Sequence, residues 1–331
     1  MKKNIMWGIL LLLVIFCLLI SACGTAEKSS ENNVSEQNKL TEITISAASV
    51  GGTWDVTSQL MKQLIEENMP DTRVTVTRGG GVSNVVGVSE GQFDFAWTYT
   101  PTLYQGIKGE APFDKAYTNV VGFANTYMCE WNAAVLANSD IKSINDLKGK
   151  RISPGVAGYS GEQMCKEVLE VYGLTYDDMS KVEFLDYGDS TTLMKDREID
   201  FMCPAAVTPV PAMAEIDSTN PISLIPLDQD KLEELKKINP GYAGKVVPKG
   251  TYKGLTEDTL QLAFGNILVV RKDLDENLVY NVLKVMWENR NKLLTVHQAY
   301  SQFTEELAPQ IYGAELHPGA KKFFKEIGAI K

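Results

Sequence analysis

The sequence predicts an α/β protein built from two similar lobes, and three observations lead to this fold class. Apolar runs of strand length alternate with amphipathic helical patterns. The order strand, glycine-rich loop, helix, strand, small-residue loop, helix and acid-aromatic strand occurs from residue 43 and again from residue 151. The copies keep one register, because 106 residues separate Gly52 from Gly158 and also Asp94 from Asp200. A chance likeness between two ordinary strand-helix-strand units is the alternative.

The N-terminal segment is not expected to belong to this fold. Two lysines precede an apolar run at 5–20, which is shorter than the ~20 residues of a membrane-spanning helix. The following stretch ISAC at 20–23 resembles the bacterial lipobox, which implies cleavage before Cys23 and acylation of that cysteine. An ordinary signal peptide or an uncleaved anchor is the alternative.

The segment after Cys23 is polar and nearly free of aliphatic residues, so it is expected to be a tether. The remaining chain is long enough for two lobes of ordinary domain size. To within about ten residues, the predicted parts are a signal peptide at 1–22, a linker at 23–40, lobe 1 at 41–135 plus 265–331, and lobe 2 at 136–264.

The charge balance is acidic. The formal net charge is −10 for the full sequence and becomes −12 once the two lysines of the signal segment are removed. No basic run occurs, so nucleic acid is not expected as a partner. Three cysteines remain after Cys23, namely Cys129, Cys165 and Cys203, and their spacing fits neither a disulfide framework nor a zinc site. They are expected to be small buried residues, although one pair could form a disulfide.

The first glycine-rich loop reads SVGGTWDVTSQL at 49–60 and joins a strand to a helix. Glycine at 51 and 52 permits positive φ and close approach of another group to the backbone. Thr53, Asp55 or both are candidates to cap the helix. Trp54 follows at once, and it could cover a ligand or pack in the core.

Four such loops, at 50–55, 79–84, 155–162 and 187–191, are expected to face one cleft. Parallel α/β sheets bind ligands outside the carboxyl ends of their strands, where helix N-termini offer partial positive charge and free N–H groups. A carboxylate or similar anion fits such a site. The expected ligand-binding residues are Gly52, Thr53, Trp54, Ser83, Asn84, Tyr99, Tyr159, Ser160 and Gly161.

Several candidates also have plain structural interpretations. Helix capping competes with ligand contact at Ser83 and Asn84, and Tyr99 could pack between the lobes. Trp131 could belong to the hinge core. Structural roles are expected for the two strand-start aspartates, and a buried strand is expected at Ala263–Val270, with helices at Leu278–Leu294 and in the last thirty residues.

Enzyme chemistry is poorly supported by the sequence. The two histidines, His297 and His317, both lie in the C-terminal region, and His317 precedes a proline at the expected start of the last helix. The stretch GYSGE at 158–162 lacks the second glycine of a nucleophile elbow, and no Walker motif occurs. We therefore expect no catalytic residues, no metal and no cofactor.

Six motifs together resemble the TAXI class of receptors for tripartite (TRAP) transporters. They are GGTW at 51–54, GGGVSN at 79–84, EGQFDFA at 90–96, IKSINDLKGKR at 141–151, NPGY at 239–242 and LHPGA at 316–320. The resemblance implies the type II periplasmic-binding-protein fold, with two Rossmann-like lobes, a hinge and an interlobe ligand cleft. Two departures from the family pattern, at Trp54 and at 158–162, touch the expected pocket and bear on the ligand rather than on the fold.

The resemblance also implies a function. The protein would be an extracytoplasmic lipoprotein, anchored to the membrane through acylated Cys23, that closes on a small organic acid or glutamate-like amino acid and delivers it to TRAP permease subunits. Two alternatives stay open. One is a binding protein of an ABC importer for an aromatic or sulphonate compound, and the other is a ligand-sensing input protein for a membrane kinase.

Overall fold

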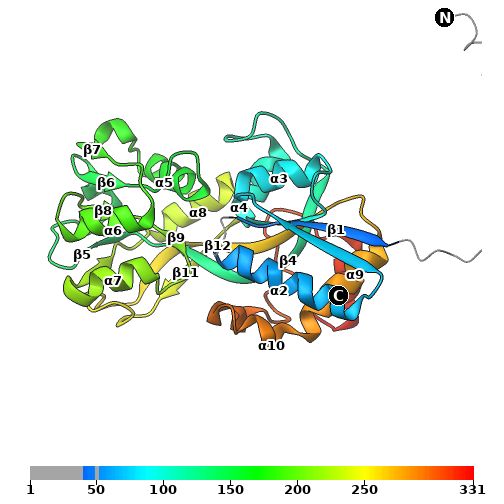
Figure 1. Ribbon diagram of the computed structural model, residues 1–331. Helices are drawn as coiled ribbons and strands as arrows, with labels where there is room; N and C mark the ends of the chain where they lie inside the picture. The colour runs from blue at the N-terminus through cyan, green and yellow to red at the C-terminus, as the bar shows by residue number, and fades with distance from the viewer. Residues whose placement is uncertain (1–39, 49–51) are drawn as a thin grey trace, which may run out of the picture. The chain divides into compact units, whose positions relative to one another are not determined.

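The computed structural model describes residues 40–48 and 52–331, and two mixed β-sheets organise its fold (Figure 1). In this part of the chain, the first sheet has seven strands in the order β2-β1-β3-β12-β4-β9, with β11 paired to β12. Its strands are β1 (Thr41–Ser46), β2 (Thr72–Thr77), β3 (Phe95–Tyr99), β4 (Val120–Trp131), β9 (Ala205–Ala206), β11 (Tyr242–Val247) and β12 (Thr259–Arg271). The predicted signal, Cys23 and Gly51 lie outside the described residues.

The second sheet has five strands within the described residues, in the order β10-β5-β8-β6-β7. They are β5 (Ala134–Leu136), β6 (Arg151–Ser153), β7 (Lys181–Val182), β8 (Phe201–Met202) and β10 (Ile222–Leu224). We call the elements around the first sheet lobe 1 and those around the second sheet lobe 2.

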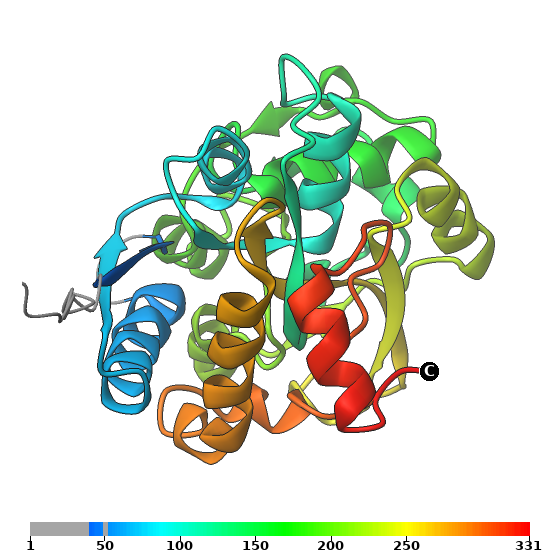
Figure 2. The same cartoon turned by 90° about the vertical axis from the view of Figure 1, so that its right-hand side faces the viewer.

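Helices cover both sheets. Lobe 1 carries α2 (Thr53–Asn68), α3 (Gly81–Ser89), α4 (Thr100–Lys108), α9 (Glu276–Glu288), α10 (Arg290–Leu293), η3 (Gln298–Gln302) and α11 (Pro318–Glu326). Lobe 2 carries η1 (Ile144–Leu147), α5 (Ser160–Val171), η2 (Tyr176–Asp178), α6 (Tyr187–Lys195) and α7 (Pro211–Thr219), while α8 (Gln229–Ile238) precedes β11. Figure 2 shows α9 and α11 packed side by side on lobe 1. No helix of the described residues has the length and apolarity that a membrane crossing requires.

The internal repeat predicted from the sequence is confirmed by the strand pairings. In lobe 1, β1 pairs in parallel with β2 and with β3. In lobe 2, β6 pairs in parallel with β7 and with β8. An antiparallel strand flanks each set, because β12 pairs with β3 and β5 pairs with β8. Both lobes are therefore built on the same three-strand unit.

The chain passes between the sheets through segments that two buried amide side chains hold together. Asn132 follows β4, and its Nδ2 atom donates to the carbonyl oxygens of Pro204 and Ala206 at 3.1 Å each. Gln261 on β12 donates from Nε2 to Ile225 O at 2.7 Å, and its Oε1 atom accepts from Ala133 N–H at 2.9 Å. These bonds join crossing segments that are far apart in sequence, as a hinge between two lobes requires.

The C-terminal elements differ in extent from the prediction. The strand predicted at Ala263–Val270 runs over Thr259–Arg271, and the helix predicted at Leu278–Leu294 is divided at Asn289 into α9 and α10. The expectation for His317 is confirmed, because its side chain accepts a hydrogen bond from Gly319 N–H and caps α11. Burial lowers the pKa of this histidine.

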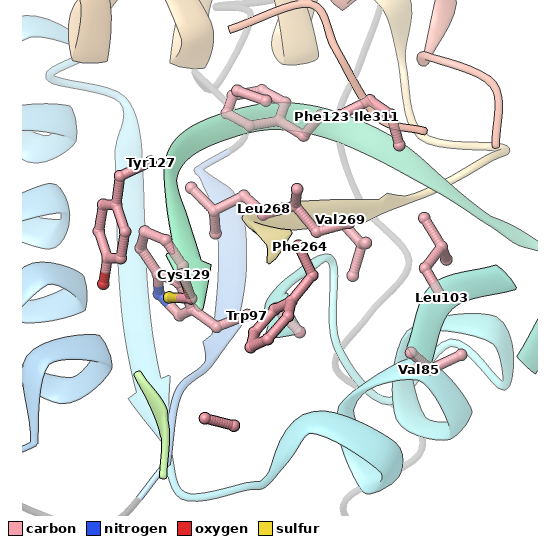
Figure 3. Packing of buried hydrophobic residues seen from close by; sticks show 14 of the residues in the cluster. Val85, Trp97, Leu103, Phe123, Tyr127, Cys129, Phe264, Leu268, Val269 and Ile311 are labelled. Carbon is pink, nitrogen blue, oxygen red and sulfur yellow. The ribbon is translucent and has the colours of Figure 1, made fainter. Parts of the chain in front are cut away.

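The core of lobe 1 lies around the pair of long strands. Figure 3 shows Phe123 and Cys129 on β4 beside Phe264 and Leu268 on β12, with Trp97 close to them. All five side chains are at most 3% exposed. The same cluster continues through Trp131 into one face of lobe 2, so Trp131 belongs to the hinge core. Cys165 and Cys203 are also buried, as expected from the sequence.

Candidate functional site

Trp54 stands at the start of α2 and forms one wall of the candidate site. Gly52 is the N-cap residue in extended conformation and offers no side-chain cap, while Thr53 begins the helix and Asp55 lies in its first turn. The Trp54 ring stacks on Trp97 with centroids 6.3 Å apart and meets Tyr99 at 5.2 Å. Such aromatic pairs stabilise the position of a ring beyond the contribution of its buried area.

Asn266 on β12 fixes the orientation of the Trp54 ring. The indole Nε1–H of Trp54 donates to Asn266 Oδ1 at 2.6 Å. The Asn266 amide is itself oriented, because its Nδ2 atom donates to Thr126 Oγ1 at 2.9 Å. Sequence reasoning missed Asn266, since a buried asparagine within an apolar strand gives no sign of the side chain that it meets.

The start of α3 leaves main-chain donors open beside this wall. Gly80 is the N-cap residue without a side-chain cap, and the first intrahelical bond runs from Asn84 N–H to Gly80 O at 2.8 Å. The N–H groups of Gly81, Val82 and Ser83 thus have no acceptor inside the helix. Ser83 is exposed, and its hydroxyl donates to Gly80 O at 3.0 Å. In α2, the N–H groups that precede the first intrahelical bond include those of Thr53 and Trp54.

Asn84 has a structural role that the sequence did not separate from ligand contact. It is fully buried, and its Nδ2 atom donates to Ala47 O at 2.8 Å and to Trp97 O at 2.7 Å. Its Oδ1 atom accepts from Ser46 Oγ at 2.7 Å and from Gly80 N–H at 3.2 Å. With these groups and its own N–H occupied, Asn84 positions the start of α3, and we do not include it among the proposed ligand contacts.

Tyr99 lies at the carboxyl end of β3 as the N-cap residue of α4. Its ring meets Phe264 edge-on at 4.9 Å, in addition to its contact with Trp54. Burial raises the pKa of the Tyr99 phenol, and Cys129 and Tyr187 nearby add to this. The phenol therefore stays neutral at physiological pH and keeps its O–H available as a donor.

The helix starts of lobe 2 differ from those of lobe 1, because carboxylates already occupy part of them. Tyr159 is the N-cap residue of α5 and is 67% exposed. Glu162 in the first turn is only 2% exposed, accepts a hydrogen bond from Gly158 N–H at 3.1 Å and pairs with Lys166 at 2.8 Å. At the start of α6, Asp186 accepts from Asp189 N–H at 3.0 Å.

The structure brings residues of both lobes together at Gly81. A Cβ atom added to Gly81 would lie 3.2 Å from Ser160 Oγ and 3.9 Å from the Trp54 ring. Thr102 of α4 donates from Oγ1 to Ser160 Oγ at 3.0 Å. A side chain at position 81 would therefore press on Ser160, which would have to shift slightly. Thr102 was not predicted, and a threonine within a helix gives no sequence signal of such a contact.

Tyr187 is a third residue that the sequence analysis did not single out, although it begins the predicted loop at 187–191. It is the first residue of α6 and is 37% exposed. Its hydroxyl accepts from Ala205 N–H at 3.0 Å and donates to Ala205 O at 3.3 Å. These bonds tie α6 to β9, where the chain crosses between the two sheets. The repeat could have indicated this position, because Tyr187 corresponds in register to Gly81.

Other surface features lie away from these helix starts. A hollow of about 390 Å³ is lined by residues of α9, α10 and η3, including Trp287 and Arg290, and by none of the predicted site residues. Among residues 40–48 and 52–331, no three histidine, cysteine or acidic side chains are grouped as a metal site would require.

A model of the NMT1-like family matches residues 45–328. The chain belongs to the NMT1-like family. This NMT1-like protein is also similar in structure to the periplasmic aliphatic sulphonate binding protein SsuA from Escherichia coli. That likeness has a TM-score of 0.51 and 13% identity, and it covers 86% of this chain and 83% of SsuA.

PhnD1 from Prochlorococcus marinus, solved with methylphosphonate, is similar with a TM-score of 0.50 and 11% identity. That likeness covers 88% of the NMT1-like protein and all of PhnD1. At such low identities the similarity is one of fold, and the two-lobe α/β fold of type II periplasmic binding proteins predicted from the sequence is confirmed.

Proposed function

We propose that this NMT1-like protein is an extracytoplasmic solute-binding lipoprotein of the TAXI class that delivers a small carboxylate to a TRAP permease. One observation carries the proposal: the helix starts of both lobes meet beside an aromatic wall, where Gly81 approaches Ser160 and Trp54. Family membership and the two-lobe fold support it. The division into lobe 1 at 41–135 plus 265–331 and lobe 2 at 136–264 is part of the proposal.

The proposed ligand lies with its carboxylate against lobe 1. Gly80 leaves the start of α3 uncapped by a side chain, and the first turn of α3 carries no acidic residue, so its N–H groups can bind an anion, whereas Asp55 lies in the first turn of α2. In lobe 2, Glu162 and Asp186 place negative charge at the corresponding starts. We therefore assign the carboxylate to the N–H groups of lobe 1 and the remainder of the ligand to lobe 2.

The rest of the ligand would lie between the aromatic wall and lobe 2. Trp54 and Tyr99 would cover its carbon chain from lobe 1. Ser160, the Gly161 N–H group and the exposed ring of Tyr159 would complete the site from lobe 2. Thr102 and Ser160, which are hydrogen-bonded across the lobes, would separate when the cleft opens.

A thermal-shift screen of amino acids, dicarboxylates, alkanesulphonates and methylphosphonate tests this proposal. A carboxylate at about 100 times its dissociation constant should stabilise the fold by about 2.7 kcal/mol, which raises the melting midpoint by a few degrees. The methyl ester of the same compound should bind at least about tenfold more weakly, since a charge-assisted hydrogen bond contributes about 1.5–3 kcal/mol. A screen in which no carboxylate shifts the midpoint would refute carboxylate binding.

Matched tryptophan variants test the position of the site. Trp54→Phe keeps a ring but loses the bond to Asn266, and it should reduce the ligand-induced shift in melting midpoint. Trp287→Phe is the control, because Trp287 lies on α9 against Phe303 and Phe323, among residues that carry none of the proposed contacts. Equal ligand-induced shifts in both variants would place the site elsewhere.

Membrane anchoring is tested separately from binding. Mass spectrometry of protein extracted from membranes should show Cys23 as the first residue with a large hydrophobic addition. An N-terminus at Met1, or an unmodified one, would contradict the lipoprotein assignment and leave the binding proposal intact.

The second candidate is a binding protein of an ABC importer. The fold likeness to a sulphonate-binding protein favours testing it, and helix N-termini can bind sulphonates as well as carboxylates. A midpoint shift with an alkanesulphonate alone would support it. Neighbouring genes distinguish the partners, since a permease pair, an ATPase or a membrane kinase would indicate a TRAP transporter, an ABC importer or a sensor, respectively.

A further inference from the structure

Two buried thiols lie next to each other beneath the lobe 2 side of the site. Cys165 is on α5, one helical turn after Gly161, and is fully buried. Cys203 directly follows β8, is 3% exposed, and its thiol approaches Ser153 O at 3.8 Å. Burial raises the pKa of the Cys203 thiol, and the neighbouring Cys165 thiol raises it further, which is consistent with two thiols that lie close together.

The packing of α5 on the crossing segment places these two cysteines opposite each other. A Cβ atom added to Gly161 would lie 3.2 Å from the Ala205 Cβ atom. From Gly161 to Cys165 the helix advances about 6 Å, and the two residues from Ala205 back to Cys203 would span about 6.6 Å if they are extended. The helix also runs antiparallel to β8, because it connects strands that are parallel to β8. Contact at the first pair therefore brings the second pair into register.

We propose that Cys165 and Cys203 form a disulfide bond when the protein folds in the presence of a small-molecule disulfide. Formation of this disulfide in the cell rests on the proposed function, namely the protein's extracytoplasmic location, since disulfides persist in oxidising compartments. It does not depend on the identity of the ligand or of the permease.

The chemistry is two successive thiol–disulfide exchanges. One cysteine, as thiolate, attacks a sulfur of oxidised glutathione, so a mixed disulfide forms and one glutathione thiolate leaves. The second cysteine thiolate then attacks the protein sulfur of that mixed disulfide and expels the second glutathione. The two cysteines lose two protons and two electrons in total, and one glutathione disulfide is reduced to two thiols.

The bond has a clear place in the fold. It would tie the first turns of α5, which carry Ser160 and Gly161, to the segment that crosses to lobe 1. Burial raises the pKa of the Cys203 thiol, so exchange in the folded protein is slow and the bond forms before the lobe closes over it. Cys129, on β4, is also buried and free, and it serves as an internal control.

Refolding of the full-length chain with a glutathione redox buffer tests the proposal. After refolding, free thiols are alkylated in denaturant and the digest is mapped with and without reductant. A linked peptide pair containing Cys165 and Cys203 is expected, together with a Cys129 peptide that is alkylated without reduction. Alkylation of Cys165 and Cys203 without reduction, in protein that has regained its melting transition, would overturn the proposal.

Variants separate the bond from a general effect of reductant. Reduction should lower the melting midpoint by several degrees in the wild type and in Cys129→Ala. The midpoint of the double variant Cys165→Ala/Cys203→Ala should not respond to reductant. An equal response in the double variant would also overturn the proposal.

Protein taken directly from cells gives a second result that distinguishes the two proposals. A linked pair in that protein supports both the disulfide and the oxidising location. Free thiols in cell-derived protein, combined with a linked pair after refolding, support the disulfide geometry and count against the extracytoplasmic location.

Discussion

Lobe 1 and lobe 2 fix the start of their third strand with the same pair of hydrogen bonds. In lobe 1, the Asp94 carboxylate accepts from Thr44 N–H at 2.8 Å, and Asp94 N–H donates to Thr44 O at 3.0 Å. In lobe 2, the Asp200 carboxylate accepts from Arg151 N–H at 2.9 Å, and Asp200 N–H donates to Arg151 O at 2.8 Å. The two aspartates thus have the structural roles expected from the sequence.

The lobes also attach their second helix to their first strand at equivalent positions. Ser46 at the end of β1 donates to Asn84 of α3 at 2.7 Å. Ser153 at the end of β6 is 2.7 Å from Ser190 of α6 in a hydroxyl pair. The Asn84 amide in lobe 1 bonds side-chain and backbone groups on several segments, whereas the Ser190 hydroxyl in lobe 2 bonds Ser153 and the carbonyl oxygen of Asp186.

The lobes differ most in what lies behind the first aromatic residue of each site. Trp54 packs on Trp97 and Tyr99, whereas the residues in register with these two in lobe 2 are Cys203 and Ala205. Small residues give Tyr159 no ring to pack against, and it is 67% exposed. The Trp54 wall is therefore already packed in the absence of ligand, whereas the exposed Tyr159 ring can change its position when a ligand binds.

The largest expected effect compares the two helix attachments. Asn84→Ala should reduce the free energy of unfolding by about 3 kcal/mol, because it removes a buried amide that bonds the Ser46 hydroxyl and two backbone carbonyl groups. Ser190→Ala should cost about 1 kcal/mol, since it removes one hydroxyl. Urea denaturation measures both losses, and equal values would show that the two attachments contribute alike.

The next effect compares the two aromatic residues in the absence of ligand. Trp54→Ala should destabilise the protein by about 2 kcal/mol, through loss of ring packing and of the bond to Asn266. Tyr159→Ala should change stability by less than about 0.5 kcal/mol, because the ring is exposed. A cost at Tyr159 as large as that at Trp54 would mean that lobe 2 also has a packed aromatic wall.

A smaller effect compares the two aspartates. Asp200→Asn breaks the paired bonds from Arg151 Nε at 3.0 Å and NH2 at 2.5 Å and should cost about 1 kcal/mol, as both side chains are partly exposed. Asp94→Asn should cost less, since the asparagine oxygen still accepts from Thr44 N–H and the Arg271 contact is looser at 3.5 Å.

The pH dependence of Asp200 follows from the same contact. Hydrogen bonds from Arg151 lower the pKa of the Asp200 carboxyl in the folded state. Its contribution to stability is therefore present above the unfolded-state pKa of about 3.9. That contribution is lost as the pH falls through the lowered folded-state pKa. Denaturation series at pH 2 to 6 should show less acid sensitivity in Asp200→Asn than in the wild type.

The smallest effect concerns Glu167, a buried acid between the lobes. Its pKa is shifted in the opposite direction to that of Asp200. Glu167 of α5 accepts from Gln105 Nε2 at 2.5 Å, from Tyr242 OH at 2.6 Å and, within its own helix, from Gln163 Nε2 at 3.2 Å. Burial raises the pKa of Glu167 despite these bonds, and the neighbouring Glu170 adds to the rise. The folded state thus holds this proton more tightly than the unfolded state.

The contribution of Glu167 to stability therefore falls as the pH rises from its unfolded-state pKa of about 4.3 through its raised folded-state pKa. Glutamine has no charge at any pH. The free energy of unfolding of Glu167→Gln, relative to wild type, should rise between pH 4 and pH 7 in urea titrations. A relative stability that stays constant over this range would contradict the assignment of a raised pKa.

The sequence predicted the repeat because its signals are local: paired glycines, strand-start aspartates and alternating apolar residues need no knowledge of neighbours. It missed the N-terminal part of β12, since Gln261 interrupts the apolar pattern there yet is buried and bonded to a distant segment. The role of Asn84 was ambiguous for the same reason. Whether an amide near a helix start points inward depends on which strands lie beside it.

The pairing of β4 with β12 has a consequence for the order of folding. The strands of lobe 2 all lie between β4 and β12 along the chain, in a stretch that also contains the two-residue strand β9 of the first sheet. Closing so long a loop costs entropy, and the cost falls once the intervening residues are compact. We expect lobe 2 to form first and bring β12 to β4, so that lobe 1 gains its central strand pair only after the last third of the chain is available.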